Sequence, residues 1–122
     1  MSKKILIVDD SESIREVVCF TLENAGFQVF KGVDGVDALT VLNANAPVDL
    51  IITDLHMPNM DGIEFIRQVR ANEAFKFVPI LFLTTESQND KKMAAKDAGA
   101  TGWIVKPFVP EKLLAAITKV VR

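Results

Sequence analysis

Short apolar runs alternate with longer segments of helical spacing along the 122-residue chain. The runs cover residues 5–8, 28–30, 50–53, 79–83 and 102–105, of which 28–30 is the weakest. Runs this short that stay apolar and rich in branched side chains are typical of strands buried on both faces of a parallel sheet. The pattern therefore predicts five buried strands.

The remaining segments predict five helices, over residues 14–25, 36–42, 61–69, 89–98 and 110–120. Asp61 is the expected N-cap of the third helix, and Pro110 suits the first turn of the fifth. Gly26 and Gly99 are expected to end the first and fourth helices. Strand and helix alternate five times, which predicts one α/β domain over residues 1–122, with right-handed crossovers and a doubly wound parallel sheet.

Polar residues follow four of the predicted strands: Asp9 and Asp10 after the first, Asp54 after the third, Thr84 after the fourth and Lys106 after the fifth. Ligands of doubly wound sheets bind beyond the carboxyl ends of the strands. Turns favour aspartate, so a single acid there would be unremarkable. Three carboxylates with a hydroxyl and an ammonium group indicate a binding site.

The chemistry of this group points to phosphoryl transfer. Three converging carboxylates repel one another and raise one another's pKa values, and a hard divalent cation such as Mg²⁺ relieves that repulsion. A metal, an ammonium and a hydroxyl would then stabilise an incoming phosphoryl group. A carboxylate is the expected nucleophile, and its product would be an acyl phosphate.

Composition excludes several other classes of protein. The chain is 49% hydrophobic and 25% charged, as in ordinary globular domains, and its net charge of −2 offers no basic field for nucleic acid or an anionic membrane. One cysteine forms no internal disulfide, which suits a reducing compartment. The apolar run after Lys4 is too short for a signal peptide, and no run approaches a membrane span. We expect a cytoplasmic protein.

These motifs resemble the receiver domain of bacterial two-component response regulators over the whole chain. The resemblance rests on residues 5–10, Asp54 with residues 55–58, Asp61-Gly62, Thr84, and residues 106–108. It implies a flavodoxin-like, five-stranded parallel sheet of (βα)5 topology with strand order 2-1-3-4-5.

The resemblance also implies roles for the strand-end residues. Asp54 would accept a phosphoryl group from the phosphohistidine of a sensor histidine kinase. Mg²⁺, or Mn²⁺ in its place, would be held by Asp9, Asp10, Asp54 and the backbone carbonyl of His56. Thr84 and Lys106 would bind phosphoryl oxygens, and the Lys106–Pro107 peptide would be cis.

A switch and an output face are implied as well. Thr84 would move toward the phosphoryl group, and Trp103 on the fifth strand would turn inward behind it. The simpler alternative is that Trp103 only packs at the sheet edge. The fourth helix, fifth strand and fifth helix would form the partner face, made basic by Lys91, Lys92, Lys96 and Lys112, although a run of charges is often only a solvated surface.

Further residues receive narrower predictions. His56 and Glu86 lie at positions that tune the lifetime of the acyl phosphate in this family, while His56 is otherwise an exposed loop residue. Cys19 is expected to be a small buried hydrophobe. Met57, Met60 and Met93 are expected to pack in the core or a loop, and Asp34-Gly35 is read as a turn.

The favoured function is a stand-alone receiver without an output domain, because the fifth helix reaches the last residue, Arg122; a receiver excised from a longer protein is an alternative. We expect a signalling phosphoacceptor and not an enzyme. The stretch from residues 91–93 through 106–108 resembles chemotaxis-type regulators, which implies a chemotaxis-type kinase and a flagellar motor switch protein as partners. The alternative is a relay intermediate serving a histidine phosphotransfer protein, and a phosphatase is a further partner.

Two other classes share parts of the pattern. An Mg²⁺-dependent aspartate-nucleophile phosphatase would need an acid two residues after Asp54, where His56 stands. A flavin carrier of the same fold would need a donor-rich phosphate loop after the first strand, and Asp9 and Asp10 would repel that phosphate.

Overall fold

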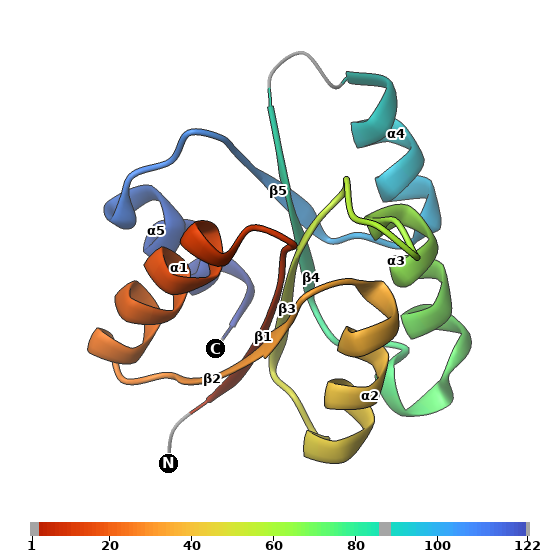
Figure 1. Cartoon of the computed structure of the whole chain (residues 1–122), viewed down its shortest axis with the longest axis horizontal. Coiled ribbons are helices and arrows are strands. Elements are labelled where there is room, and N and C mark those ends of the chain that lie inside the picture. The colour runs from red at the N-terminus through yellow and green to blue at the C-terminus, as the bar shows by residue number, and fades with distance from the viewer. Residues whose placement is uncertain (1–2, 86–88, 122) are drawn as a thin grey trace.

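Five parallel strands form a single sheet in the order β2-β1-β3-β4-β5 (Figure 1). The computed structural model describes residues 3–85 and 89–121. The strands are β1 (Lys4–Val8), β2 (Gln28–Gly32), β3 (Leu50–Asp54), β4 (Ile80–Thr84) and β5 (Gly102–Val105). The predicted strands and the flavodoxin-like strand order are therefore confirmed.

Five α-helices connect and follow these strands: α1 (Glu12–Asn24), α2 (Gly35–Asn45), α3 (Gly62–Ala71), α4 (Asn89–Ala98) and α5 (Pro110–Val120). A short 3₁₀ helix, η1 (Glu73–Phe75), precedes β4 and was not expected from the sequence. None of the helices in the described part of the chain is long and apolar enough to cross a membrane.

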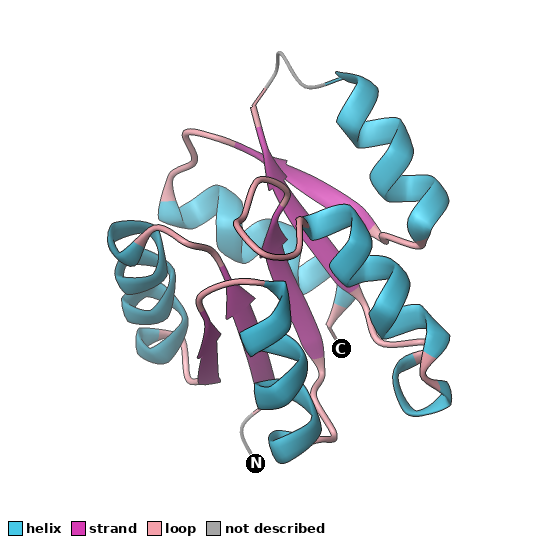
Figure 2. Ribbon diagram, turned by 45° about the vertical axis from the view of Figure 1, so that its right-hand side comes forward, coloured by secondary structure: helices cyan, strands magenta, loops and turns pink. Residues whose placement is uncertain are grey.

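The helices cover both faces of the sheet, with α1 and α5 on one face and α2, α3 and α4 on the other (Figures 1 and 2). Successive side chains of β1 alternate between these faces. Ile5 and Ile7 pack with Val18 and Leu22 of α1, whereas Leu6 packs into the opposite core, which contains Phe65 and Ile66 of α3. Burial on both faces explains why the strand sequences are continuously apolar.

Side-chain caps fix the start of three helices. Ser11, Asp34 and Asp61 accept hydrogen bonds from the backbone N–H groups three residues later, at the starts of α1, α2 and α3. The N-cap predicted for Asp61 is confirmed. The turn predicted at Asp34-Gly35 is wrong, because Asp34 caps α2 and Gly35 is its first residue. Caps and turns favour the same residue types, so the sequence did not separate them.

One arginine joins the end of α3 to three other segments. The guanidinium of Arg70 donates from Nε to the carbonyl oxygen of Gly99 at 3.0 Å, and from Nη1 to that of Val78 at 2.7 Å. The same Nη1 also reaches the carbonyl oxygens of Phe75 and Lys76. Burial lowers the pKa of Arg70. This contact set ties the chain after α4 to the region between α3 and β4.

Predictions for the sulfur-containing residues hold in three cases of four. Cys19 is buried and free, and burial raises the pKa of its thiol. Met57 and Met60 pack partly buried against the core, but Met93 is exposed on α4, so the packing prediction for Met93 is wrong. Its helix covers the core with Ala95 and turns Met93 to solvent.

Candidate functional site

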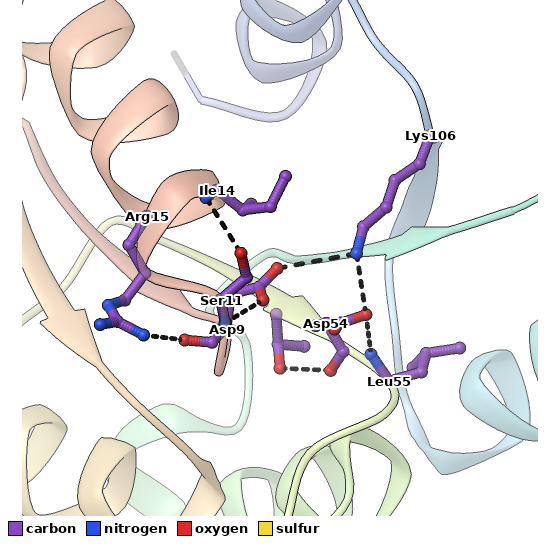
Figure 3. A network of polar contacts seen from close by, with 8 residues as sticks. Asp9, Ser11, Ile14, Arg15, Asp54, Leu55 and Lys106 are labelled. Carbon is purple, nitrogen blue, oxygen red and sulfur yellow. Dashed lines mark hydrogen bonds and ion pairs between the residues drawn. The ribbon is translucent and has the colours of Figure 1, made fainter.

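The parallel register brings the predicted site residues to one edge of the sheet. Val8 pairs with Thr53, so Asp9 and Asp54 follow at neighbouring positions of β1 and β3. Asp54 pairs with Leu83, and Thr84 pairs with Val105, the residue before Lys106. We call the group of Asp9, Asp10, Asp54 and Lys106 the acid pocket; Figure 3 shows Asp9, Asp54 and Lys106.

Asp54 is the last residue of β3, and the residue is only 8% exposed. Its Oδ1 accepts a hydrogen bond from the backbone N–H of Leu55 at 2.8 Å and lies 3.3 Å from Nζ of Lys106. Within the described residues, these contacts all fall on Oδ1, and none falls on Oδ2. One carboxylate oxygen is therefore anchored, and the other is left for chemistry.

Asp9 is more deeply buried, at 1% exposure. Its Oδ1 accepts from the backbone N–H of Ser11 at 2.9 Å, whereas Oδ2 has no hydrogen-bond partner among the described residues and lies 3.7 Å from Nζ of Lys106. Desolvation by burial raises the pKa of Asp9; the Ser11 bond opposes this, and the negative charge of Asp54 adds to it. A buried carboxylate oxygen without a hydrogen bond is rare and calls for a ligand.

Lys106 reaches the pocket from the end of β5 and bridges the two buried acids. Its backbone N–H donates to the carbonyl oxygen of Thr84 at 2.6 Å, which fixes it beside β4. The Lys106–Pro107 peptide bond is cis, as the family resemblance implied, and a second cis bond, Ala46–Pro47, was not expected. The Thr84 side chain is buried and donates to the carbonyl oxygen of Thr85 at 3.2 Å.

Three supporting residues of the pocket were missed in the sequence. Arg15, one turn into α1, donates from Nη1 to the carbonyl oxygen of Asp9 at 2.6 Å (Figure 3). Ser11 holds the Asp9 carboxylate through its N–H and caps the same helix. A Cβ on Gly62 would lie 2.1 Å from the carbonyl oxygen of Asp54, so only glycine fits there. The Asp61-Gly62 pair was noticed as a motif, but nothing in it revealed this contact.

The acid pocket fits a small divalent cation. Asp9, Asp10 and Asp54 each offer a carboxylate oxygen, and the three oxygens lie within 4.8 Å of one another. Among the described residues, Lys106 alone forms ion pairs with these acids, and Oδ2 of Asp9 has no hydrogen bond. Mg²⁺ prefers hard oxygen ligands such as carboxylates, and it usually keeps several of its own waters as further ligands.

Of the two residues predicted to tune the lifetime of the acyl phosphate, only His56 lies within the described residues. His56 lies exposed in the β3–α3 loop (residues 55–61), two residues beyond Asp54. Glu86 lies outside the described residues, so the predicted contact between them stays a prediction.

Trp103 lies on the edge strand β5, with 41% of its surface exposed. Its ring contacts Phe82 of β4, with centroids 6.1 Å apart. The ammonium groups of Lys92 and Lys96 lie 5.5 and 5.4 Å from the indole, within cation–π range. Lys112 lines the groove beside Trp103 between β5 and α5, and Lys91 is exposed on α4. Four residues predicted for the partner face therefore lie together at β5, namely Trp103, Lys92, Lys96 and Lys112. The indole is in its outward position in this arrangement.

Comparison with known proteins decides the family. The sequence matches the response regulator receiver domain over residues 5–118. The chain belongs to this family. Receiver domains are modules of two-component signalling, so the acid pocket lies in a protein of that class.

Similar receivers include chemotaxis proteins. Chemotaxis protein CheY1 of Helicobacter pylori strain J99 is 40% identical over 111 residues, which cover 90% of each chain. The structure of chemotaxis protein CheY4 of Vibrio cholerae is 48% identical with a TM-score of 0.94, and the match covers 99% of this chain and 100% of that one.

A third receiver bears on the metal. The receiver domain of the sensor histidine kinase PA1611 from Pseudomonas aeruginosa PAO1 was solved with a magnesium ion coordinated in the active site cleft. It is 27% identical with a TM-score of 0.90, and the match covers 98% of both chains.

Proposed function

We propose that this receiver takes a phosphoryl group on Asp54 from the phosphohistidine of a sensor histidine kinase. The observation that carries the proposal is the state of the Asp54 carboxylate: Oδ1 is fixed by Leu55 and Lys106, no contact falls on Oδ2 among the described residues, and two further acids lie close by. A fixed, largely buried carboxylate with one uncommitted oxygen is suited to nucleophilic attack.

The transfer forms a bond between Oδ2 of Asp54 and phosphorus as the bond between phosphorus and the histidine nitrogen breaks. The imidazole leaves with the electron pair of that bond and takes a proton from water. Lys106, 3.3 Å from Oδ1, stays beside the developing negative charge, and the Thr84 hydroxyl lies on the neighbouring strand end to donate to a phosphoryl oxygen.

Mg²⁺, or Mn²⁺ in its place, would be held by Asp9, Asp10, Asp54 and the backbone carbonyl of His56. When bound, the cation supplies positive charge that lets the phosphoryl oxygens approach three carboxylates. The fit rests on the three clustered oxygens and on Oδ2 of Asp9, which has no hydrogen bond among the described residues. The side chains of His56 and Glu86 are proposed to limit attack of water on the acyl phosphate.

The output is proposed to leave through α4, β5 and α5. Phosphorylation would draw Thr84 toward Asp54 and let Trp103 turn inward, away from Lys92 and Lys96. That movement changes both the shape and the charge pattern of the face that includes Lys91 and Lys112. In this structure, the indole lies beneath the ammonium groups of Lys92 and Lys96, and these groups would lose that contact.

We propose a flagellar motor switch protein as the partner of this face, ahead of a histidine phosphotransfer protein. Support comes from the chemotaxis proteins among the similar chains and from the share of those chains that is matched. On this proposal the chain acts in the cytoplasm beside a chemotaxis-type kinase. It promotes only its own phosphorylation and dephosphorylation and does not turn over outside substrates.

The decisive experiment adds a small phosphodonor such as phosphoramidate, with Mg²⁺, and follows the intact mass. We expect a gain of one phosphoryl group that disappears in Asp54→Asn and in excess EDTA. Asp49→Asn is the matched control, because Asp49 lies before β3 at the opposite end of the strand. Uptake that survives in Asp54→Asn would remove Asp54 as the acceptor.

A further inference from the structure

The β3–α3 loop has an unfavourable backbone conformation at one residue. Asn59 has φ = 67°, the only positive φ among the described residues other than glycine. A left-handed residue costs about 1–2 kcal/mol, and asparagine is among the few types that adopt it at all. Such a conformation persists only where neighbouring contacts enforce it.

The enforcing contact comes from another part of the chain. Nδ2 of Asn59 donates to Oδ2 of Asp34 at 2.7 Å, across 25 positions of sequence. Asp34 is buried, and its other oxygen, Oδ1, accepts from the N–H of Asp37 at 2.8 Å. The hydrogen bonds from Asp37 and then Asn59 lower the pKa of Asp34. The carboxylate therefore stays charged and accepts two bonds at once.

Asp34 itself is held rigidly. Its backbone oxygen accepts from Ala38, and Oδ2 of Asp37 accepts in return from the N–H of Val33 at 3.0 Å, so the start of α2 is capped in both directions. A Cβ on Gly32 would lie 2.9 Å from Ala38, which shows how closely the end of β2 approaches α2. Asp34 is therefore held by contacts that do not involve the β3–α3 loop.

The β3–α3 loop is thus fixed at two places. Near its ends, the N–H of Gly62 donates to the carbonyl oxygen of Leu55 at 2.9 Å. At its outer part, Asn59 is tied to Asp34. His56, whose carbonyl is the proposed backbone ligand of the metal, lies between these two fixed places.

We propose that Asp34 and Asn59 are positioning residues for the metal site, which hold the β3–α3 loop so that the His56 carbonyl points into the acid pocket. This inference rests on the proposed function, because it requires that the acid pocket binds Mg²⁺. Neither residue touches the metal; they act through the backbone between Asn59 and His56. Outer groups that orient metal ligands are typically worth tenfold or more in metal affinity.

Two variants remove the hydrogen bond between Asn59 and Asp34 and preserve the other role of each residue, the α2 cap of Asp34 and the left-handed backbone of Asn59. Asp34→Ser keeps a good N-cap for α2 but is too short to reach Asn59. Asn59→Gly keeps the left-handed backbone free of strain but has no side chain to donate. The measurement is the dissociation constant for Mg²⁺ by titration calorimetry of the unphosphorylated chain, with urea unfolding in EDTA as the measure of stability.

We expect each variant to weaken Mg²⁺ binding by about tenfold. The double variant should be no weaker than either single one, since both remove the same bond. Asn72→Ser, which alters the cap of η1 at the far end of α3, should leave the constant unchanged. Unchanged Mg²⁺ affinity in both variants, while the parent chain binds Mg²⁺, would overturn the positioning role alone. A parent chain that does not bind Mg²⁺ would overturn the proposed function as well.

Discussion

The acid pocket and the α4–β5 side of the molecule are built in opposite ways. All five residues of β3, which carries Asp54, are buried, whereas on β5 only Ile104 is. Short hydrogen bonds from the backbone hold the carboxylates of Asp9 and Asp54, whereas the ring of Trp103 is held by cation–π contacts and by its contact with Phe82.

This difference suits the separate tasks proposed for the two regions. A site that must place carboxylates within reach of one metal and one phosphorus atom needs a fixed backbone, and the central strands supply it. A surface that changes on signalling needs contacts that break at low cost, since elements that move come from the less stable parts of a fold. The following predictions disturb first the acid pocket and the helices packed on the sheet, and then the α4–β5 side.

The largest effect is expected from Gly62→Ala. The new Cβ would meet backbone atoms, namely the carbonyl oxygen of Asp54 at 2.1 Å and Cα of Leu55 at 2.7 Å. Backbone of a central strand cannot yield easily, so we expect the free energy of unfolding to fall by about 3 kcal/mol or more, measured by urea denaturation. The matched control is Gly102→Ala on β5, where the nearest atom is a side-chain carbon of Leu81 at 3.3 Å. Equal losses in the two variants would contradict the contrast between the regions.

Arg70→Ala should have the next largest effect, because it leaves the carbonyl oxygens of Gly99, Phe75, Lys76 and Val78 without the guanidinium. We expect a loss of about 2–3 kcal/mol and faster hydrogen exchange in α4. Arg70→Lys should restore only part of the stability, since an ammonium cannot reproduce the planar fork.

Arg67→Ala is the control on the same helix, because Arg67 is exposed and pairs only with Glu64 at 3.5 Å. It should cost less than about 0.5 kcal/mol. Exchange in α4 that is unaffected by Arg70→Ala would show that this arginine does not anchor that helix.

Asp9→Asn should raise stability in the absence of metal, and the gain should depend on pH. The pKa of Asp9 in the folded chain is raised, mainly by desolvation, so folding is penalised wherever Asp9 is charged. The penalty is complete above the folded pKa and fades as pH falls toward the ordinary value of 3.8. Each unit by which the pKa is raised corresponds to about 1.4 kcal/mol.

Urea unfolding in EDTA at pH 7 and at about pH 4 measures this effect, and Asp10→Asn serves as the exposed control. With saturating Mg²⁺ the parent chain should become more stable than Asp9→Asn, because the parent chain gains the binding free energy of the metal. A gain in stability that does not depend on pH would mean that the burial of a charged Asp9 is not its cause.

The smallest effect is expected on the α4–β5 side. Replacing both Lys92 and Lys96 by Gln removes two cation–π contacts from Trp103, each worth about 0.5–1 kcal/mol at an exposed site. The outward position of the indole should become less populated, so acrylamide should quench the single tryptophan less. Lys91→Gln is the control on the same helix. Quenching that is identical in all three proteins would show that the lysines do not hold the ring.

Most of the fold and the centre of the site could be predicted from the sequence. Buried parallel strands leave a continuous apolar signal, and their register then places Asp9, Asp54, Thr84 and Lys106 at one edge. What escaped prediction are contacts between ordinary loop residues. The bond from Asn59 to Asp34 depends on a backbone angle, and the space beside Gly62 depends on how closely two chain segments approach. No local pattern encodes either.

Cys19 gives this receiver a practical property for spectroscopy. Its thiol is enclosed by the packing of α1 on the sheet, and the burial that raises its pKa also keeps it in the unreactive protonated form at neutral pH. A cysteine introduced at the exposed Met93 would be the one that reacts with a maleimide dye. The chain can therefore carry a single reporter on α4 without replacement of its own cysteine.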